Sequence, residues 1–223
     1  MSRVKAIIVV VLLVGIAGAG AIYGINRFYV KAIHEQTKSA LSNADQDVLG
    51  RLKISAFKSI QVLSAKSRDE ELTGPLTRLP SVPADASEED IKRALGDSSA
   101  TLAKKLRTLN KKKQFDQLMA ISSDGHVVAR IPGEDKFGDS VKGLPAVSEC
   151  LSGIHRDGFY ELKQSIHQVA VAPLMSSSGR VAGCLMGTME MNSASLRPFA
   201  QVSEFDAALF VGGKLKVSTV DPA

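Results

Sequence analysis

The chain has 223 residues, with 28 lysines and arginines against 23 aspartates and glutamates and a formal net charge of +5. This length is sufficient for one domain with a full core and a helical extension. The two cysteines, Cys150 and Cys184, are too few for a disulfide scaffold, and neither has a second cysteine or a histidine at the spacing of a zinc site. Their apolar neighbours indicate small core residues, and a disulfide is the alternative that an oxidising compartment permits.

Residues 6–25 carry no charged side chain, and basic residues flank this run on both sides. At ~1.5 Å per residue, a helix of this length crosses a hydrocarbon core of ~30 Å. The pattern predicts a short cytoplasmic N-terminus over residues 1–5 and a transmembrane helix, a signal anchor, over residues 6–29. The lipid bilayer is therefore the first expected partner.

A cleaved secretory signal is the alternative, because Ala17, Gly18 and Ala19 form a small-residue pattern that signal peptidase accepts. The apolar run is longer than the usual signal core of about 7 to 15 residues. The aromatic residues Tyr23 and Phe28 resemble an aromatic belt at the far membrane interface. We therefore expect the segment to remain attached.

Residues 30–67 contain no proline and a single glycine, and six apolar residues recur among them at helical spacing. These residues are Leu41, Val48, Leu52, Ala56, Ile60 and Leu63. They predict a helical stalk whose apolar stripe needs cover, either from the domain that follows or from a second copy of the chain. A homodimer through the stalk is therefore expected. Three prolines within residues 75–83 then interrupt the helical pattern, so that residues 30–86 form a stalk and a Pro-rich connector.

Helix is predicted to resume at Ser87, whose hydroxyl can cap it together with Asp90, and to be interrupted briefly at Gly96. Six basic residues follow late in this helical pattern: Lys104, Lys105, Arg107, Lys111, Lys112 and Lys113. We interpret them as a solvated helix face near the negative end of the helix dipole, with phospholipid headgroups as the alternative partner. No nucleic acid is expected as a partner of a chain exported behind a membrane anchor.

From Phe115 onward, short apolar runs alternate with turns. Residues 115–122 and 126–131 flank Asp124 and Gly125, a pair typical of a tight hairpin. The same construction recurs at 168–175 with 180–191 and at 207–211 with 214–219, and short helices are predicted at 145–153 and 193–202. The predicted fold class is therefore α+β. Residues 87–223 are expected to form a PAS-like antiparallel sheet with flanking helices over one face, and the long membrane-linked helix precedes this domain.

An ordered set of short motifs runs through this region. Asp124-Gly125 precedes an apolar strand, residues 138–140 lead into Leu144-Pro145 and a helix ending at Gly153, and strands follow at 169–173, 183–187 and 213–219. In this order and spacing, residues 31–219 resemble a Cache-type (PAS-like) extracellular sensor domain of bacterial transmembrane signalling proteins.

The resemblance implies a small-molecule ligand bound between the sheet and its covering helices and read out as movement of the membrane-linked helix. It also places the C-terminal domain in the periplasm, anchored by a single pass in the inner membrane. Cache domains that bind amino acids use a signature that includes tryptophan, which this chain lacks. Receptors of this kind usually continue into a second membrane helix and an output module, whereas this chain stops at Ala223. We therefore expect a separate signalling partner, or a shortened receptor.

The ligand-binding residues that we would select are Arg130, Tyr160, Lys163 and His167. His167 should share a strand face with Val169 and point toward the core. The ordinary alternatives are a core histidine bonded to a backbone carbonyl, a surface arginine at a hairpin end, a half-buried strand tyrosine and a solvated lysine. These donors favour a small carboxylate, an organic acid, as the ligand.

Catalysis is not expected, because the chain has no nucleophile elbow, phosphate loop or zinc-protease motif. His155, Asp157 and His167 are too dispersed along the chain to predict a metal site, and no cofactor is expected. A membrane-tethered interaction or scaffold protein that retains the fold without a ligand is the main competing function. An enzyme that uses His167 as a base is a weaker one.

Overall fold

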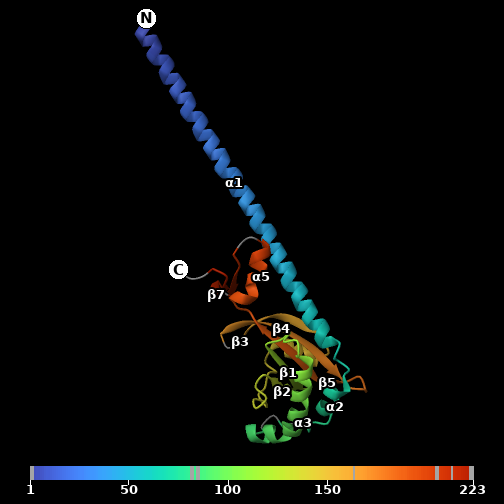
Figure 1. Ribbon diagram of the computed structural model, residues 1–223. Coiled ribbons are helices and arrows are strands. Elements are labelled where there is room, and N and C mark those ends of the chain that lie inside the picture. Colours follow the sequence, from blue (N-terminus) through green and yellow to red (C-terminus); the bar gives the residue numbers. More distant parts are fainter. Residues whose placement is uncertain are drawn as a thin grey trace. The chain divides into compact units, whose positions relative to one another are not determined.

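A computed structural model of the chain describes residues 3–80, 83, 86–162, 164–203, 206–211 and 213–220 (Figure 1). Side chains are described from Lys31 onward, except at positions 32, 33, 199, 202 and 203. Contacts divide the chain into two units, Met1–Leu49 and Gly50–Ala223. Helix α1, Arg3–Ser64, begins in the first unit and ends in the second.

No helix is long and apolar enough to cross a membrane within the part of the chain whose side chains are described. The transmembrane helix predicted over residues 6–29 lies outside that part.

The final turns of α1 belong to the second unit and pack against its other elements. Ala56 and Leu63 are buried, Ile60 packs against the main core, and Leu52 packs against a smaller apolar cluster near the C-terminus. The C-terminal part of the predicted apolar stripe is therefore covered by the chain's own domain. Leu41, in the first unit, is 56% exposed.

Two further helices follow, α2 over Glu70–Thr77 and α3 over Glu88–Leu109. Pro75 lies inside α2 and not in a connector, because Leu72 and Leu76 are buried in the core and their packing outweighs the cost of a helical proline.

Helix α3 begins as predicted, since the Ser87 hydroxyl accepts a hydrogen bond from the Asp90 amide. The helix continues through Gly96, so the predicted interruption is wrong. A glycine costs a helix only about 1 kcal/mol, and the burial of Leu95 and Leu102 on either side of it opposes a break.

Five strands form one antiparallel sheet in the order β2-β1-β5-β4-β3. They are β1 Gln117–Ser122, β2 Val127–Ile131, β3 Arg156–Leu162, β4 Ser165–Met175 and β5 Val181–Glu190. The predicted hairpins β1–β2 and β4–β5 are present. Gly125 closes the first with φ +87°, where a Cβ would also lie 2.7 Å from the Cβ of Lys142.

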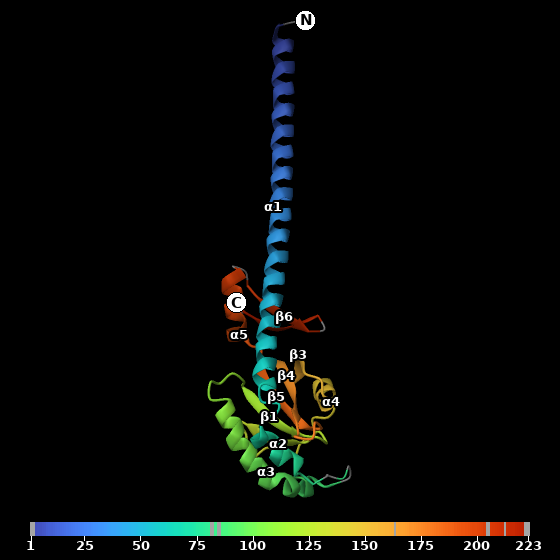
Figure 2. The ribbon, with the colours of Figure 1, turned by 90° about the vertical axis from the view of Figure 1, so that its right-hand side faces the viewer.

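Helices cover both faces of the sheet, not one as expected (Figure 2). Helices α2 and α3 and the end of α1 pack on the first face. Helix α4, Pro145–Leu151, packs on the second, which we call the α4 face. Strands β1, β4 and β5 are buried at nearly consecutive positions and therefore need cover on both sides. The predicted α+β class, an antiparallel sheet with flanking helices, is confirmed.

A disulfide joins Cys150 on α4 to Cys184 on β5, with the two Cα atoms 6.3 Å apart. Both cysteines are fully buried in the apolar cluster beneath α4. They are the small core residues that the sequence indicated, and they are also paired.

The C-terminal part forms a small module of its own. It contains helix α5, Ser193–Ser203, and a two-stranded sheet of β6, Ala208–Val211, and β7, Lys214–Ser218. Leu196 of α5 is buried against Ile166 and Met191 of the main domain, and Leu52 of α1 packs against the same cluster.

Candidate functional site

Tyr160 on β3 and His167 on β4 lie directly opposite each other in the sheet register. Strand alternation puts both on the α4 face, together with Val169 and Val171. The Tyr160 ring lies over Gly158, because a Cβ at position 158 would lie 3.1 Å from its Cε2 and 3.5 Å from its hydroxyl oxygen. The absent side chain of Gly158 thus makes room for the phenol, which packs against the apolar cluster.

His167 is half-buried, and its Nδ1 is buried without a hydrogen-bond partner among the described residues. Its neighbours on the two adjacent strands are Tyr160 and Glu190. A buried polar nitrogen without a partner is uncommon and costly, so this position favours contact with an added donor or acceptor.

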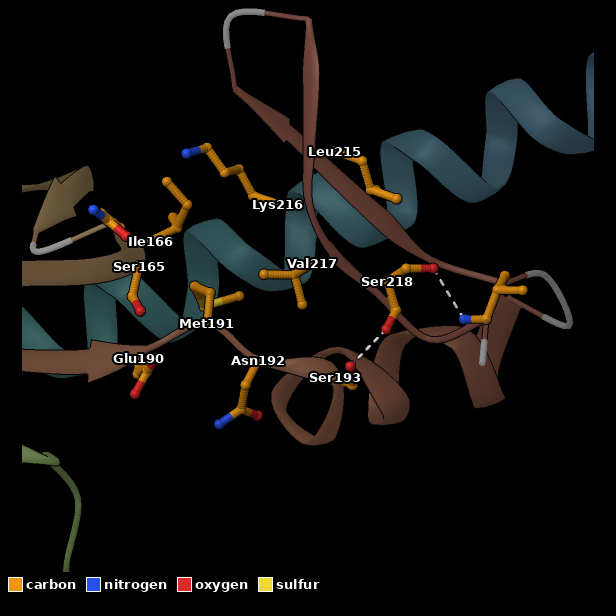
Figure 3. A pocket seen from close by; sticks show the side chains of 12 residues that line it. Ser165, Ile166, Glu190, Met191, Asn192, Ser193, Leu215, Lys216, Val217 and Ser218 are labelled. Carbon is orange, nitrogen blue, oxygen red and sulfur yellow. Dashed lines mark hydrogen bonds between the residues drawn. The ribbon is translucent and has the colours of Figure 1, made fainter. Parts of the chain in front are cut away.

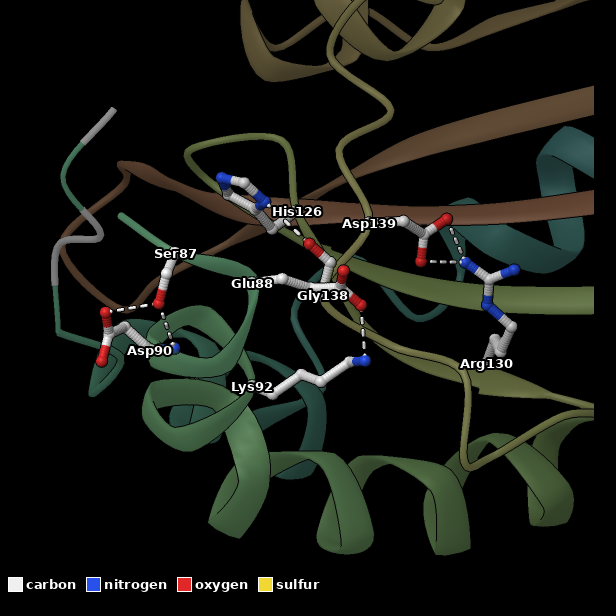
Figure 4. Close-up of polar contacts among 8 residues, drawn as sticks. All are labelled: Ser87, Glu88, Asp90, Lys92, His126, Arg130, Gly138 and Asp139. Atoms are coloured by element: carbon white, nitrogen blue, oxygen red, sulfur yellow. Dashed lines mark hydrogen bonds and ion pairs between the residues drawn. The ribbon is translucent and has the colours of Figure 1, made fainter. Parts of the chain in front are cut away.

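Arg130 lies on β2 and is 9% exposed. Its Nη2 donates to both carboxylate oxygens of Asp139 (Figure 4). Its Nε is buried and has no hydrogen-bond partner among the described residues. Arg130 is one of the residues that line a cavity of about 490 Å³, which we call the Arg130 cavity. The cavity is lined by Glu88, Lys92, Arg130, Asp135, Lys136, Phe137 and Asp139.

The structure does not bring Arg130 to the Tyr160–His167 pair. Arg130 is in register with Met119 on β1, which is in register with Met186 on β5 and, through it, with Val171 on β4. His167 is three strands away from Arg130 and four residues before Val171, which is roughly 20 Å at standard strand spacings. One small ligand therefore does not contact both residues. Lys163, the fourth predicted residue, lies outside the described residues.

Apolar side chains occupy the space between α4 and the middle of the sheet. Val147 and Cys150 of α4 contact one buried cluster that includes Met119, Val171 and Met186 of the strands. Polar groups on this face therefore lie toward its ends, at Tyr160 and His167 on one side and at Arg130 on the other.

A groove of about 600 Å³ separates the ends of β4 and β5 from strand β7 (Figure 3). Its floor includes the buried Ile166 and Met191, and its wall on β7 includes Lys216, which forms an ion pair with Glu161 at 2.5 Å. No predicted site residue that the structure describes lines this groove. Its walls come from segments about 50 residues apart in the sequence, and only the tertiary fold brings them together.

Two exposed ion pairs involve side chains of α3, and the first of them lines the Arg130 cavity. Lys92 donates to Glu88 at 2.6 Å, and this hydrogen bond lowers the pKa of Glu88 and raises the pKa of Lys92. The Nε of Arg107 donates to Glu134 at 2.5 Å, which lowers the pKa of Glu134. The second pair fixes the segment after β2 onto α3.

No family model and no curated protein matches this chain. Among solved structures, the sensor domain of the V. cholerae histidine kinase DctB matches with a TM-score of 0.60, 14% identity, and coverage of 85% of this chain and 68% of that chain. The E. coli DcuS sensor domain gives a TM-score of 0.49 at 12% identity, over 67% of this chain and 95% of that chain. The ligand-binding domain of the Campylobacter jejuni chemoreceptor Tlp3, in complex with 4-methylisoleucine, gives 0.44 at 14% identity, over 81% and 71%.

The likeness to the DctB sensor domain concerns the fold, since at 14% identity it does not extend to individual site residues. In this chain the fold consists of a long N-terminal helix, a five-stranded antiparallel sheet and helices on both of its faces. The chain therefore has an α+β fold similar to that of the DctB sensor domain, as the resemblance to Cache-type sensor domains predicted.

Proposed function

We propose that this protein is a single-pass, membrane-anchored sensor whose extracytoplasmic domain binds a small ligand and signals through a separate partner. The observation that carries the proposal is the continuity of α1, which runs from Arg3 to Ser64 and ends with Leu63 buried in the domain core. If ligand binding displaces the end of this helix, the same helix carries the movement to the predicted membrane segment. The disulfide supports an oxidising compartment such as the periplasm.

The Tyr160–His167 pair is the ligand site that we favour. A phenol hydroxyl and an imidazole lie on adjacent strands, and the buried Nδ1 of His167 has no hydrogen-bond partner in the part of the chain that the structure describes. Lys163 stands between these two strands in the sequence, so it remains part of the proposed site. These groups favour a small organic acid, held by hydrogen bonds to its carboxylate.

A scaffold that keeps the fold without a ligand is the second candidate. It is favoured by the apolar packing between α4 and the sheet, where Val147, Met119 and Met186 fill the space beneath the helix. The two functions differ in a measurable way, because only a sensor gains stability from a small molecule.

Two experiments test the proposal. Reporter fusions after Leu63 and after the exposed Val220 should both be active only with an export-dependent reporter. A thermal-shift screen of the full chain in detergent against organic acids should then find a compound that raises the melting temperature. A mature chain that begins near Ala21 contradicts the anchor, and a broad metabolite library without a stabilising compound favours the scaffold.

A further inference from the structure

Arg130 is a buried cation whose hydrogen-bonding capacity is only partly used. A guanidinium has five N–H donors, and Asp139 engages Nη2 alone, accepting with both of its oxygens. The Nε–H of Arg130 is buried without a partner among the described residues. Leaving such a donor unpaired is destabilising, more so where the group is charged. An acceptor in the adjoining cavity removes this cost once the guanidinium turns its Nε–H, which is shielded from solvent, toward the cavity.

A second cationic side chain, that of Lys136, lines the cavity beside Arg130. The side chains of Arg130 and Lys136 flank Gly133, because the Cδ atom of each lies 3.8 Å from the position that a Cβ on Gly133 would take. Lys136 is exposed and lines the same cavity. Its long side chain can therefore follow a ligand that contacts Arg130.

Of the three acidic side chains that line the cavity, Glu88 and Asp139 are paired locally, whereas Asp135 has no ion pair among the described residues. Lys92 donates to Glu88, and Asp139 accepts from Arg130, as Figure 4 shows. Three cationic and three acidic residues line the cavity, so its long-range field is close to neutral. In such a cavity, short charge-assisted hydrogen bonds can hold a ligand, whereas electrostatic steering contributes little.

We propose that the Arg130 cavity is a binding site for a small oxyanion, held by the Nε–H of Arg130 and the ammonium of Lys136. The site lies roughly 20 Å from the Tyr160–His167 pair, so it is separate from the ligand site proposed above and does not depend on it. Oxygen acceptors match the guanidinium edge in both planar carboxylates and tetrahedral phosphate or sulfate.

Asp139 acts in this site as an internal competitor. Its carboxylate is tethered to the same chain, is 54% exposed and, among the described residues, accepts only from Nη2. An external oxyanion shares the guanidinium with Asp139 and is repelled by its charge. Removal of the Asp139 charge should therefore strengthen anion binding. This result would distinguish a specific site at Arg130 from a general attraction of anions to surface lysines.

The test uses the full chain in detergent micelles and follows the arginine Nε–H resonances by NMR. Phosphate, sulfate and acetate are titrated separately at constant ionic strength, with chloride as the balancing salt, so that screening does not change. We expect one Nε–H resonance to shift saturably. It should be absent in Arg130→Lys, which keeps the charge but removes the Nε–H donor. The three probes separate a carboxylate-selective site from a phosphate-selective one.

If Arg130→Lys fails to fold, substitutions at two exposed residues, Lys136 and Asp139, test the proposal instead. Lys136→Met should weaken binding about tenfold, as expected for one lost charge-assisted hydrogen bond, and Asp139→Asn should strengthen it by a similar factor. Lys111→Met, a change of the same kind at an exposed lysine outside the cavity, should leave it unchanged. The absence of a saturable shift with all three anions overturns the proposal. Unchanged affinity in both Lys136→Met and Asp139→Asn also overturns it.

Discussion

Cys150 on α4 and Cys184 on β5 are bonded to each other, and each is fully buried. The bond fixes the helix that covers the α4 face to a central strand of the sheet. The two residues are separated by 34 positions, so the bond closes a large loop that includes β3 and β4. This cross-link restricts the unfolded chain more than the folded one.

The double variant Cys150→Ala/Cys184→Ala should therefore lower the free energy of unfolding by about 3 to 4 kcal/mol, the value for a closed loop of this size. Denaturant unfolding of the full chain measures the difference. The wild-type chain under reducing conditions should approach the stability of the variant. Equal stability of wild type and variant under oxidising conditions contradicts a disulfide that forms in solution.

Two glycines with opposite surroundings provide a matched pair of substitutions. At Gly183 a Cβ would lie 2.1 Å from the backbone oxygen of Ile121, which belongs to the neighbouring strand and cannot move independently. Gly183→Ala should destabilise the domain by several kcal/mol. At Gly96 no atom lies within 4 Å of such a Cβ, and the position is helical. Gly96→Ala should raise the free energy of unfolding by about 0.5 to 1 kcal/mol.

Stability should also depend on two carboxylates that face α3 or belong to it. The pKa values of Glu88 and Glu134 lie below their usual 4.5, because Lys92 and Arg107 donate hydrogen bonds to them. A lowered folded-state pKa contributes stability above the unfolded value, and that contribution is lost as the pH falls through the folded value. Stability should therefore decrease below pH 4.5, modestly because both pairs are exposed.

The variant Glu134→Gln tests this linkage. It should be less stable than the wild type at neutral pH, and the difference should shrink as the pH falls below 4.5, where the wild-type carboxylate is also protonated. Chemical denaturation at a series of pH values gives the comparison. If the difference in free energy of unfolding between wild type and variant stays constant from neutral to acidic pH, the Arg107–Glu134 ion pair is not its cause.

The sequence predicted the hairpins and helices of this domain well, because their signals are local. Asp124 and Gly125 specify a turn whose glycine has φ +87°, and Ser87 caps α3 through a hydroxyl that the pattern identified. Local propensity was overridden at Pro75 and Gly96. There, burial of leucines on the same helices outweighs residues that normally interrupt a helix.

The candidate site was harder to predict, because it depends on strand order. Arg130 and His167 both belong to the α4 face, but β1 and β5 lie between their strands, which places them roughly 20 Å apart. Nothing in the sequence indicates that β1 pairs with β5 and not with β3. Only Tyr160 and His167 could be placed together in advance, since consecutive strands joined by a short turn usually pair.

A ligand-dependent increase in stability should require the Tyr160–His167 pair. For a compound found by thermal shift, at a hundred times its dissociation constant, binding adds ~2.7 kcal/mol to the free energy of unfolding of the wild type. His167→Ala and Tyr160→Phe should each remove most of this increase. Phe159→Ala alters an exposed aromatic on the other face of the same strand and should leave it intact. If a compound stabilises the His167 and Tyr160 variants as much as the wild type, the sensor function remains supported but this ligand site is rejected.

The stalk should mediate self-association through a face that the domain leaves uncovered. Leu52 and Ile60 pack against the chain's own clusters, whereas Ile54 and Phe57, one helical turn apart, are 56% and 60% exposed. Exposed apolar residues at this spacing favour a second copy of the same helix as the partner. Ile54→Ala/Phe57→Ala should therefore shift the full chain in detergent from dimer toward monomer, as measured by light scattering with size-exclusion chromatography. Lys53→Ala/Lys58→Ala shortens exposed side chains at neighbouring positions and should leave the dimer unchanged. A wild-type chain that is monomeric at high micromolar concentration contradicts self-association through the stalk.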